Sequence, residues 1–296
     1  MGAVDVIPGV SGGTAAFITG IYEELIYSIR AIDRNAFKLL GSFQLNAFWK
    51  KINGAFLLVV LAGILTSLFT ITKIMATLLE RNPISMGSFF FGLILVSSPL
   101  ILRDIRQWNF LTISSFVAGA LLAYQITILS PLETSGNFIF VFFAAAIAVC
   151  AILLPGISMA FLLLLLGQYD FVTNAIKGVD LPIIAVFVAG CVAGLAGFSR
   201  GLAWLLTKFR FATLAFLAGI MIGSLNKAWP WKKVIAFRVN LNEIQVPAFD
   251  KNIWPGKYFE ITGHDPQLFY AILFAAVGVF LVVAIEKTAA FLRSKN

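Results

Sequence analysis

Long stretches without a charged residue alternate with short charged segments along the whole chain. A helix of about 20 apolar residues crosses the hydrocarbon core of a bilayer, and most of these stretches approach that length. The pattern therefore predicts an all-α polytopic membrane protein. The stretches run from Val6 to Tyr22, Gly54 to Thr72, Asn82 to Leu102, Gln107 to Leu132, Thr134 to Tyr169, Leu181 to Ser199, Phe211 to Asn226 and Pro266 to Ile285.

The stretch from Thr134 to Tyr169 is too long for one span and contains a helix-breaking Pro155-Gly156 pair. Two full helices that turn at a membrane surface would explain it, and so would two half-helices that meet inside the bilayer as a re-entrant hairpin. Charged residues or tryptophans normally anchor a surface turn, and none stands beside this pair. The sequence therefore favours the re-entrant hairpin.

The two halves of the chain resemble each other. Sliding the chain against itself places Pro8–Ser11 on Pro155–Ser158, with a glycine, a tyrosine and an acidic residue at matching positions downstream. If each half begins with a hairpin that returns to its own side, three full spans separate the hairpins, which then open to opposite faces. Inverted repeats of this kind are typical of secondary transporters. We therefore predict one membrane domain built of two inverted repeats, residues 1–133 and 134–296, each with a re-entrant hairpin broken at Pro-Gly and three membrane helices.

Composition narrows the class of protein. Of the 296 residues, 60% are hydrophobic and only 12% are charged, whereas about 25% are charged in soluble domains. This excludes a soluble enzyme. The net charge of +8 is explained by positive-inside loops, so we expect no nucleic-acid partner.

The distribution of lysine and arginine over short loops predicts the orientation, because cytoplasmic loops carry the excess. The richer side is cytoplasmic and includes both termini, and the loop 227–265 is then external, with tryptophans that suggest a segment along the outer interface. The richer side carries Arg30, Arg34, Lys38, Lys50, Lys51, Arg103, Arg106, Lys208, Arg210, Lys287, Arg293 and Lys295, against Arg81 and Lys177 on the other.

The two Pro-Gly tips are the sharpest chemical features. A half-helix that begins after Pro-Gly presents unpaired backbone N–H groups and a positive dipole end, which suit an anion without any charged side chain. Hydroxyl groups beside the tips would add donors. The alternative is that small residues merely allow close helix packing, which we prefer for the Gly190/Gly194 and Gly219/Gly223 pairs. The candidate phosphate-binding residues at the tips are Ser11, Gly12, Gly13, Thr14 and Ser158.

Lys73 and Arg200 form a second candidate pair, because they occupy the same position in the two halves. Inverted symmetry would place one toward each face, where each could bind a phosphate group; arginine binds it bidentately and lysine as a point charge. The alternative is that both side chains snorkel to the membrane interface.

A third pair of positions combines a tyrosine with a carboxylate: Tyr22 with Glu23, and Tyr169 with Asp170. These carboxylates either couple transport to a proton or cap the exits of the hairpins. Asp5, which has no counterpart in the second half, is expected to order the first tip through backbone N–H groups.

Signals for enzymatic chemistry are weak. The single histidine lies in a loop, and the membrane stretches hold no cluster of carboxylates and no Cys-His pair. We therefore expect no catalytic residues, no metal site and no cofactor. A transporter fits better than an enzyme.

The segment Gly2–Glu23 resembles the N-terminal signature of the PopT family, and the resemblance extends through Leu153–Ser158, Gly167–Tyr169 and Ser199–Gly201 to nearly the whole chain. Members of that family are polyprenyl-phosphate transporters of prokaryotic cytoplasmic membranes.

The resemblance implies return of undecaprenyl phosphate, a lipid carrier for envelope glycans, from the outer to the cytoplasmic leaflet. The partners would be this lipid, the surrounding membrane lipids and a coupling ion, either proton or sodium. The residues by themselves predict anion transport but do not choose a lipid. A transporter of a small soluble anion and, less favoured, a membrane enzyme acting on a lipid phosphate therefore remain as alternatives.

Overall fold

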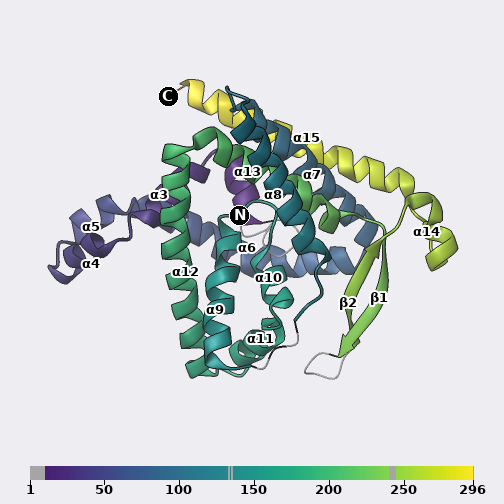
Figure 1. The fold of residues 1–296 in the computed structure, drawn as a ribbon, viewed down its shortest axis with the longest axis horizontal. Coiled ribbons are helices and arrows are strands. Elements are labelled where there is room, and N and C mark those ends of the chain that lie inside the picture. The colour runs from purple at the N-terminus through teal and green to yellow at the C-terminus, as the bar shows by residue number, and fades with distance from the viewer. Residues whose placement is uncertain (1–10, 133, 135, 240–244, 296) are drawn as a thin grey trace.

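The computed structural model describes residues 11–132, 134, 136–239 and 245–295 (Figure 1). Asp5 and the Pro8-Gly9 pair therefore lie outside the described residues. Within these, five helices are long and apolar enough to cross a membrane, or up to seven segments if each of two bent helix pairs is one span. The prediction of an all-α polytopic membrane fold is confirmed.

Several helices begin at residues that favour a helix start. Asn109, Asn137 and Asp180 each accept a hydrogen bond from a first-turn backbone N–H, and Pro83 occupies the first position of its helix. The first half contains α2 (Gly12–Ile18), α3 (Tyr22–Arg30), α4 (Arg34–Gly41), α5 (Leu45–Lys51), α6 (Gly54–Arg81), α7 (Pro83–Arg103) and α8 (Phe110–Ile128). The second contains α9 (Phe138–Ala148), the 3-10 turn η1 (Val149–Ile152), α10 (Met159–Leu165), α11 (Tyr169–Lys177), α12 (Leu181–Lys208), α13 (Arg210–Ala228), β1 (Lys232–Val239), β2 (Gln245–Asn252), α14 (Pro255–Thr262) and α15 (Leu268–Lys295).

Glycines bring the long helices into backbone contact. A Cβ atom on Gly219 or Gly223 of α13 would lie only 2.1 or 2.2 Å from a carbonyl oxygen of α8. Gly190 and Gly194 of α12 approach carbonyl oxygens of α9 in the same way, at 2.4 and 2.1 Å. The packing role predicted for both glycine pairs is confirmed. Figure 1 shows α12 beside α9 and α13 beside α8.

The chain turns back on itself at Pro155-Gly156. α9 has 11 residues and α10 has 7, so each is much shorter than the roughly 20 residues of a full span. The Leu132 N–H donates to the Leu165 carbonyl oxygen at 2.8 Å, which places the end of α10 beside the segment that leads into α9. α10 and α11 then meet at an angle of 114°. α9 and α10 are thus two short helices that lie side by side, as the predicted re-entrant hairpin requires, and neither is a full-length membrane helix.

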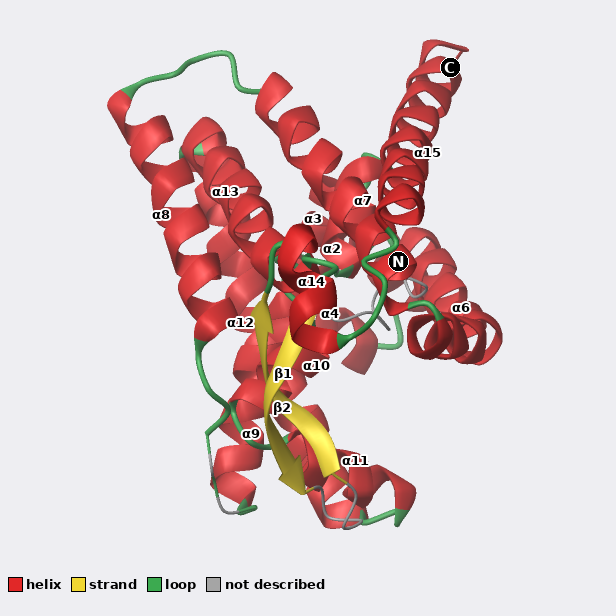
Figure 2. Cartoon of the chain, turned by 90° about the vertical axis from the view of Figure 1, so that its right-hand side faces the viewer, coloured by secondary structure: helices red, strands yellow, loops and turns green. Residues whose placement is uncertain are grey.

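The loop after α13 contains a structure that the sequence analysis did not predict. β1 and β2 form a two-stranded antiparallel sheet, the β-hairpin, with Lys232 opposite Asn252 and Lys233 opposite Lys251. Figure 2 shows the β-hairpin running alongside the helices, with α14 near one end. Its strands alternate side chains between two faces, so one face of β1 is directed toward the bundle and the other away from it.

Candidate functional site

The tips of the two halves meet and bond directly to each other. We define the first tip as the described residues 11–14 and the second tip as residues 153–158. The Ser11 hydroxyl donates to the carbonyl oxygen of Leu154 at 2.7 Å, and the Gly156 N–H donates to Thr14 Oγ1 at 3.0 Å. Ser11 and Thr14 are 1% and 0% exposed, so water does not compete for these bonds. The two segments that the sequence singled out therefore form one buried junction.

Tyr22 strengthens this junction from α3. Its hydroxyl donates to the Leu153 carbonyl oxygen at 2.6 Å, and its ring stacks on Phe17 with centroids 3.6 Å apart. Tyr22 is fully buried. It thus ties the exit of the first hairpin to the second tip.

The glycines at the junction are required by geometry. A Cβ on Gly13 would lie 3.1 to 3.3 Å from backbone atoms of Ile152, Leu154 and Pro155. Gly156 has φ +88°, a conformation that disfavours other residues, and a Cβ there would lie 2.5 Å from the Ser224 hydroxyl oxygen. Gly13 therefore permits the close approach of the two tips, and Gly156 the close approach of the second tip to α13.

Ser158 ends the second tip and caps α10. Its hydroxyl oxygen accepts a hydrogen bond from the Phe161 N–H at 3.1 Å. We predicted that the tip hydroxyls would add hydrogen-bond donors for an anion. In this structure the Ser11 hydroxyl donates within the protein, and the hydroxyl oxygens of Thr14 and Ser158 each accept a protein N–H group. Gly12 is buried beside them.

A cavity of about 530 Å³, which we name the outer cavity, opens beside the second tip. It lies at the end of the bundle that the sequence assigns to the outside, where α7 begins and α13 ends. Ser158 and Tyr169 connect it to the predicted site. Its wall consists of Leu79, Pro83, Ile84, Gly87, Phe90, Ser158, Ala160, Phe161, Leu164, Tyr169, Lys227, Ala228, Trp229, Pro230, Lys232, Asp250 and Tyr258.

The outer cavity holds an ion cluster that the sequence analysis missed. Lys227 Nζ lies 3.0 Å from Asp250 Oδ1, and Lys232 Nζ lies 2.9 Å from Asp250 Oδ2. Only 20 to 28% of these side chains is exposed. Lys232 pairs with Asn252, and Asp250 lies two positions before Asn252 on the same strand. Lys232 and Asp250 therefore lie on one face of the β-hairpin. Lys227 was visible as the first charge after a membrane stretch, but only the strand register brings Asp250 to it.

Partial burial and the neighbouring charges shift the pKa values of Lys232 and Asp250. Burial lowers the pKa of Lys232, the charge of Lys227 lowers it further, and Asp250 opposes both effects. For Asp250, burial alone would raise the pKa, but the charges and hydrogen bonds of the two lysines outweigh it and lower the pKa. The carboxylate is therefore ionised at neutral pH.

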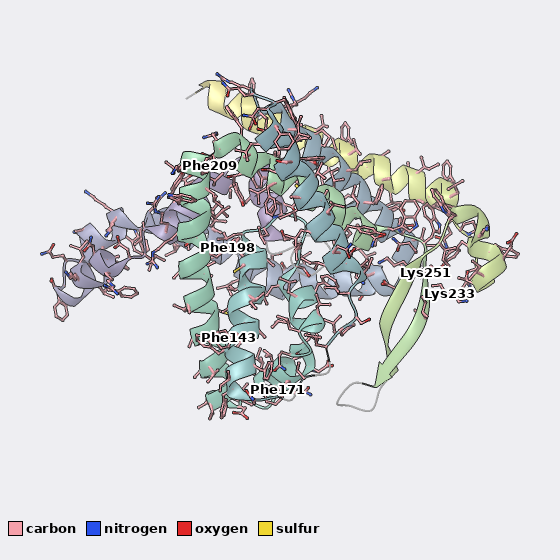
Figure 3. All side chains as sticks on the ribbon, in the orientation of Figure 1. Phe143, Phe171, Phe198, Phe209, Lys233 and Lys251 are labelled. Atoms are coloured by element: carbon pink, nitrogen blue, oxygen red, sulfur yellow. The ribbon has the colours of Figure 1, made fainter. Side chains whose placement is uncertain are left out.

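A second cavity of about 580 Å³, the inner cavity, lies on the other side of the second tip, between α8, α12 and α13. Its wall is mainly apolar, and Leu154 of the second tip forms part of it. Phe198 and Phe209, labelled in Figure 3 at α12, belong to this wall. The inner cavity lies toward the end of α12 that the sequence assigns to the cytoplasm. The second tip thus borders one cavity on each side.

The other predicted residues lie apart from the junction. Arg200 is exposed and its guanidinium donates to the Ile32 carbonyl oxygen at 3.3 Å. Glu23 forms a salt bridge of 2.7 Å with Arg210 and so links the start of α3 to the start of α13. The side chain of Lys73 lies outside the described part of the structure.

Asp170 stands in the first turn of α11, directly after Tyr169. Tyr169 is 38% exposed and lines the outer cavity, whereas its counterpart Tyr22 is buried at the junction. The two tyrosines therefore differ in environment although they match in sequence.

Comparison with known proteins identifies relatives along nearly the whole chain. Residues 1–246 match a family described as undecaprenyl phosphate translocase-like. A polyprenyl-phosphate transporter of Vibrio cholerae serotype O1 is 45% identical over 289 residues, covering 98% of this chain and 94% of the relative. A polyprenyl-phosphate transporter of Staphylococcus aureus is 31% identical over 248 residues, covering 78% and 83%. No solved structure matches.

Proposed function

The chain belongs to the undecaprenyl phosphate translocase-like family, and we propose that it moves a polyprenyl phosphate from the outer to the cytoplasmic leaflet by alternating access. The membrane is the cytoplasmic membrane of a prokaryote, with both chain termini in the cytoplasm. The chain acts as a transporter and not as an enzyme, so the lipid leaves chemically unchanged. Its relatives carry the name of polyprenyl-phosphate transporters, which supports the choice of a lipid over a soluble anion.

One observation carries the mechanism: the second tip borders both cavities. Ser158 lines the outer cavity and Leu154 lines the inner one, while the residues between them are buried against the first tip. A small displacement of this tip would therefore open a path for the headgroup to one cavity and close the path to the other. We call this buried separation of the two cavities by the second tip the partition. Alternating access requires a partition of this kind at broken helices.

Two inverted repeats, residues 1–133 and 134–296, would give the two sides equivalent gates. Matching element lengths support this proposal: α2 and α10 have 7 residues each, α3 and α11 have 9 each, and α6 and α12 have 28 each. The three membrane helices of each repeat are then α6, α7 and α8, and α12, α13 and α15. The β-hairpin and α14 are an external insertion in the second repeat.

The phosphate headgroup is held at the junction by Ser11, Gly12, Gly13, Thr14 and Ser158. Parting the two halves here breaks three neutral hydrogen bonds, those of Ser11, Thr14 and Tyr22, worth about 0.5 to 1.5 kcal/mol each, whereas a hydrogen bond to a charged group is worth about 1.5 to 3 kcal/mol. A phosphate that accepts the released Ser11 hydroxyl and Gly156 N–H therefore offsets the opening. Energetically, the substrate itself can open the junction.

Basic and acidic residues farther out complete the proposal. Lys73 and Arg200 receive the headgroup on opposite faces; the competing interpretation, that they only snorkel, is consistent with the exposure of Arg200. The carboxylates of Glu23 and Asp170, next to Tyr22 and Tyr169, couple transport to a proton or sodium ion, and Asp5 orders the first tip.

Cysteine accessibility in oriented membranes tests the partition. In a background with Cys150 and Cys191 replaced by alanine, Ala160→Cys, at an exposed position in the wall of the outer cavity, should react with a membrane-impermeant maleimide added outside. Ser115→Cys, in the inner cavity, should react only when reagent reaches the cytoplasmic side. Labelling of both from the same side would contradict alternating access. Leaflet-specific assay of labelled polyprenyl phosphate in proteoliposomes tests transport itself.

A further inference from the structure

The ion cluster of the outer cavity has a composition suited to binding an anion. Among the described residues that line this cavity, Lys227, Lys232 and Asp250 are the charged ones, so one positive charge is in excess. Each lysine contacts a different oxygen of the same carboxylate, at 3.0 and 2.9 Å. Two ammonium groups are thus already spaced to hold an anion with two or more oxygens.

We propose that Lys227 and Lys232 bind the phosphate headgroup when it enters from the outside, and that Asp250 occupies the same place as an internal anion which the headgroup displaces. This inference rests on the proposed function and names the outer binding site for its substrate. A phosphate monoester carries a charge of about −1.5 to −2 at neutral pH and three acceptor oxygens. It therefore competes well with a single carboxylate for two lysines.

The surroundings of the cluster fit an amphiphile with a charged end. The Lys227 ammonium lies 5.2 Å from the centre of the Phe161 ring, and apolar side chains such as Leu79, Phe90 and Leu164 form other parts of the cavity wall. Ser158 lines the same cavity, so the cavity extends from the two lysines to the second tip. A headgroup bound at the lysines would stand at the entrance of the proposed junction.

The β-hairpin does not depend on the ion cluster alone for its position. The Asn252 side-chain amide donates to the carbonyl and side-chain oxygens of Asn226, at 2.8 and 2.7 Å. The Trp229 indole N–H donates to the Ile253 carbonyl oxygen at 2.9 Å. Displacement of Asp250 is therefore compatible with an intact fold, and an Asp250→Asn variant should still fold.

Charge-neutralising variants of the full-length protein in nanodiscs test this inference. The probe is a short-chain prenyl phosphate, with the corresponding prenol and inorganic phosphate as competitors. Lys227→Gln and Lys232→Gln should each weaken binding by roughly tenfold or more, the loss of one charged hydrogen bond. Asp250→Asn should tighten binding several-fold, because it removes the competing anion.

Lys233→Gln is the matched control. Lys233 follows Lys232 on the same strand but points to the opposite face, and Figure 3 marks it with Lys251 on the β-hairpin. The Lys233→Gln substitution removes the same charge without changing the wall of the outer cavity, so prenyl phosphate binding should stay within about twofold of wild type.

The outcomes separate the inference from the proposed function. If the cluster is only a structural latch, Asp250→Asn will weaken binding as the lysine variants do, and the inference is overturned. Wild-type binding in both lysine variants overturns it as well, while the proposed function stands. Equal competition by inorganic phosphate and prenyl phosphate would support the anion site but assign it to a soluble ion, against the proposed function. A wild-type chain that binds no prenyl phosphate overturns both.

Discussion

Gly13 gives the most direct test of the tip junction. An added Cβ would lie 3.1 Å from the Ile152 carbonyl oxygen and 3.2 and 3.3 Å from backbone atoms of Leu154 and Pro155. Backbone atoms cannot rotate away, so the tips must separate by a few tenths of an ångström. Overpacking of this kind costs about 1 to 3 kcal/mol. Gly13→Ala should therefore lower the stability by about that amount, and Gly13→Val by more, since its branched side chain adds two methyl groups.

Separation of the tips should also impair transport, because the bonds of Ser11 and Thr14 hold the partition closed. Thermal unfolding in detergent measures the stability, and proteoliposomes loaded with labelled polyprenyl phosphate measure transport. Gly63→Ala is the control: it is also a helical glycine, but a Cβ there meets nothing within 4 Å, and helix propensity favours alanine by about 0.5 to 1 kcal/mol. If Gly13→Val unfolds and transports as wild type does, the reasoning about the junction is wrong.

Three further substitutions give graded expectations. Tyr22→Phe leaves the buried Leu153 carbonyl oxygen without its 2.6 Å partner and should cost about 1 to 3 kcal/mol in thermal unfolding; an unchanged melting temperature would contradict a role at the junction. Glu23→Gln breaks an exposed salt bridge with Arg210 and should cost no more than about 1 kcal/mol, but should alter the dependence of transport on an imposed proton gradient if Glu23 couples it. Arg200→Gln should slow release of the headgroup into the cytoplasmic leaflet while equilibrium binding from outside is retained; transport at the wild-type rate would return Arg200 to a snorkelling role.

Local chemistry allowed much of the fold to be predicted. The absence of charge over about 20 residues locates the long helices. Pro155-Gly156 locates the break in the second hairpin, because proline fixes φ and lacks an N–H donor while glycine adopts conformations that other residues avoid. The glycine pair Gly219/Gly223 likewise predicts close packing without knowledge of the partner helix. Each of these features depends on neighbours in sequence, which is why the sequence reveals them.

The ion cluster shows what such patterns leave out. Lys232 and Asp250 belong to the outer cavity only because the β-hairpin pairs Lys232 with Asn252, and a shift of one residue would turn Asp250 to the opposite face. No spacing in the sequence fixes that register. The tip hydroxyls were predicted to be near a ligand, but the bonds of Ser11 and Thr14 to the backbone of the second tip depend on how two distant segments meet, which periodicity does not encode.

The placement of charge follows from the work that a carrier must do in each cycle. Across the tips the structure describes hydrogen bonds between neutral groups, worth about 0.5 to 1.5 kcal/mol each, so the junction can part and re-form quickly. Breaking a buried ion pair there would leave an uncompensated charge at a cost of about 3 to 5 kcal/mol. Lys227, Lys232 and Asp250 instead lie at the outer cavity, 20 to 28% exposed, where water reduces the cost of exchanging one anion for another. In the proposed mechanism the ion cluster thus attracts the headgroup, and the residues of the junction move. A substitution can therefore alter one of these steps without the other.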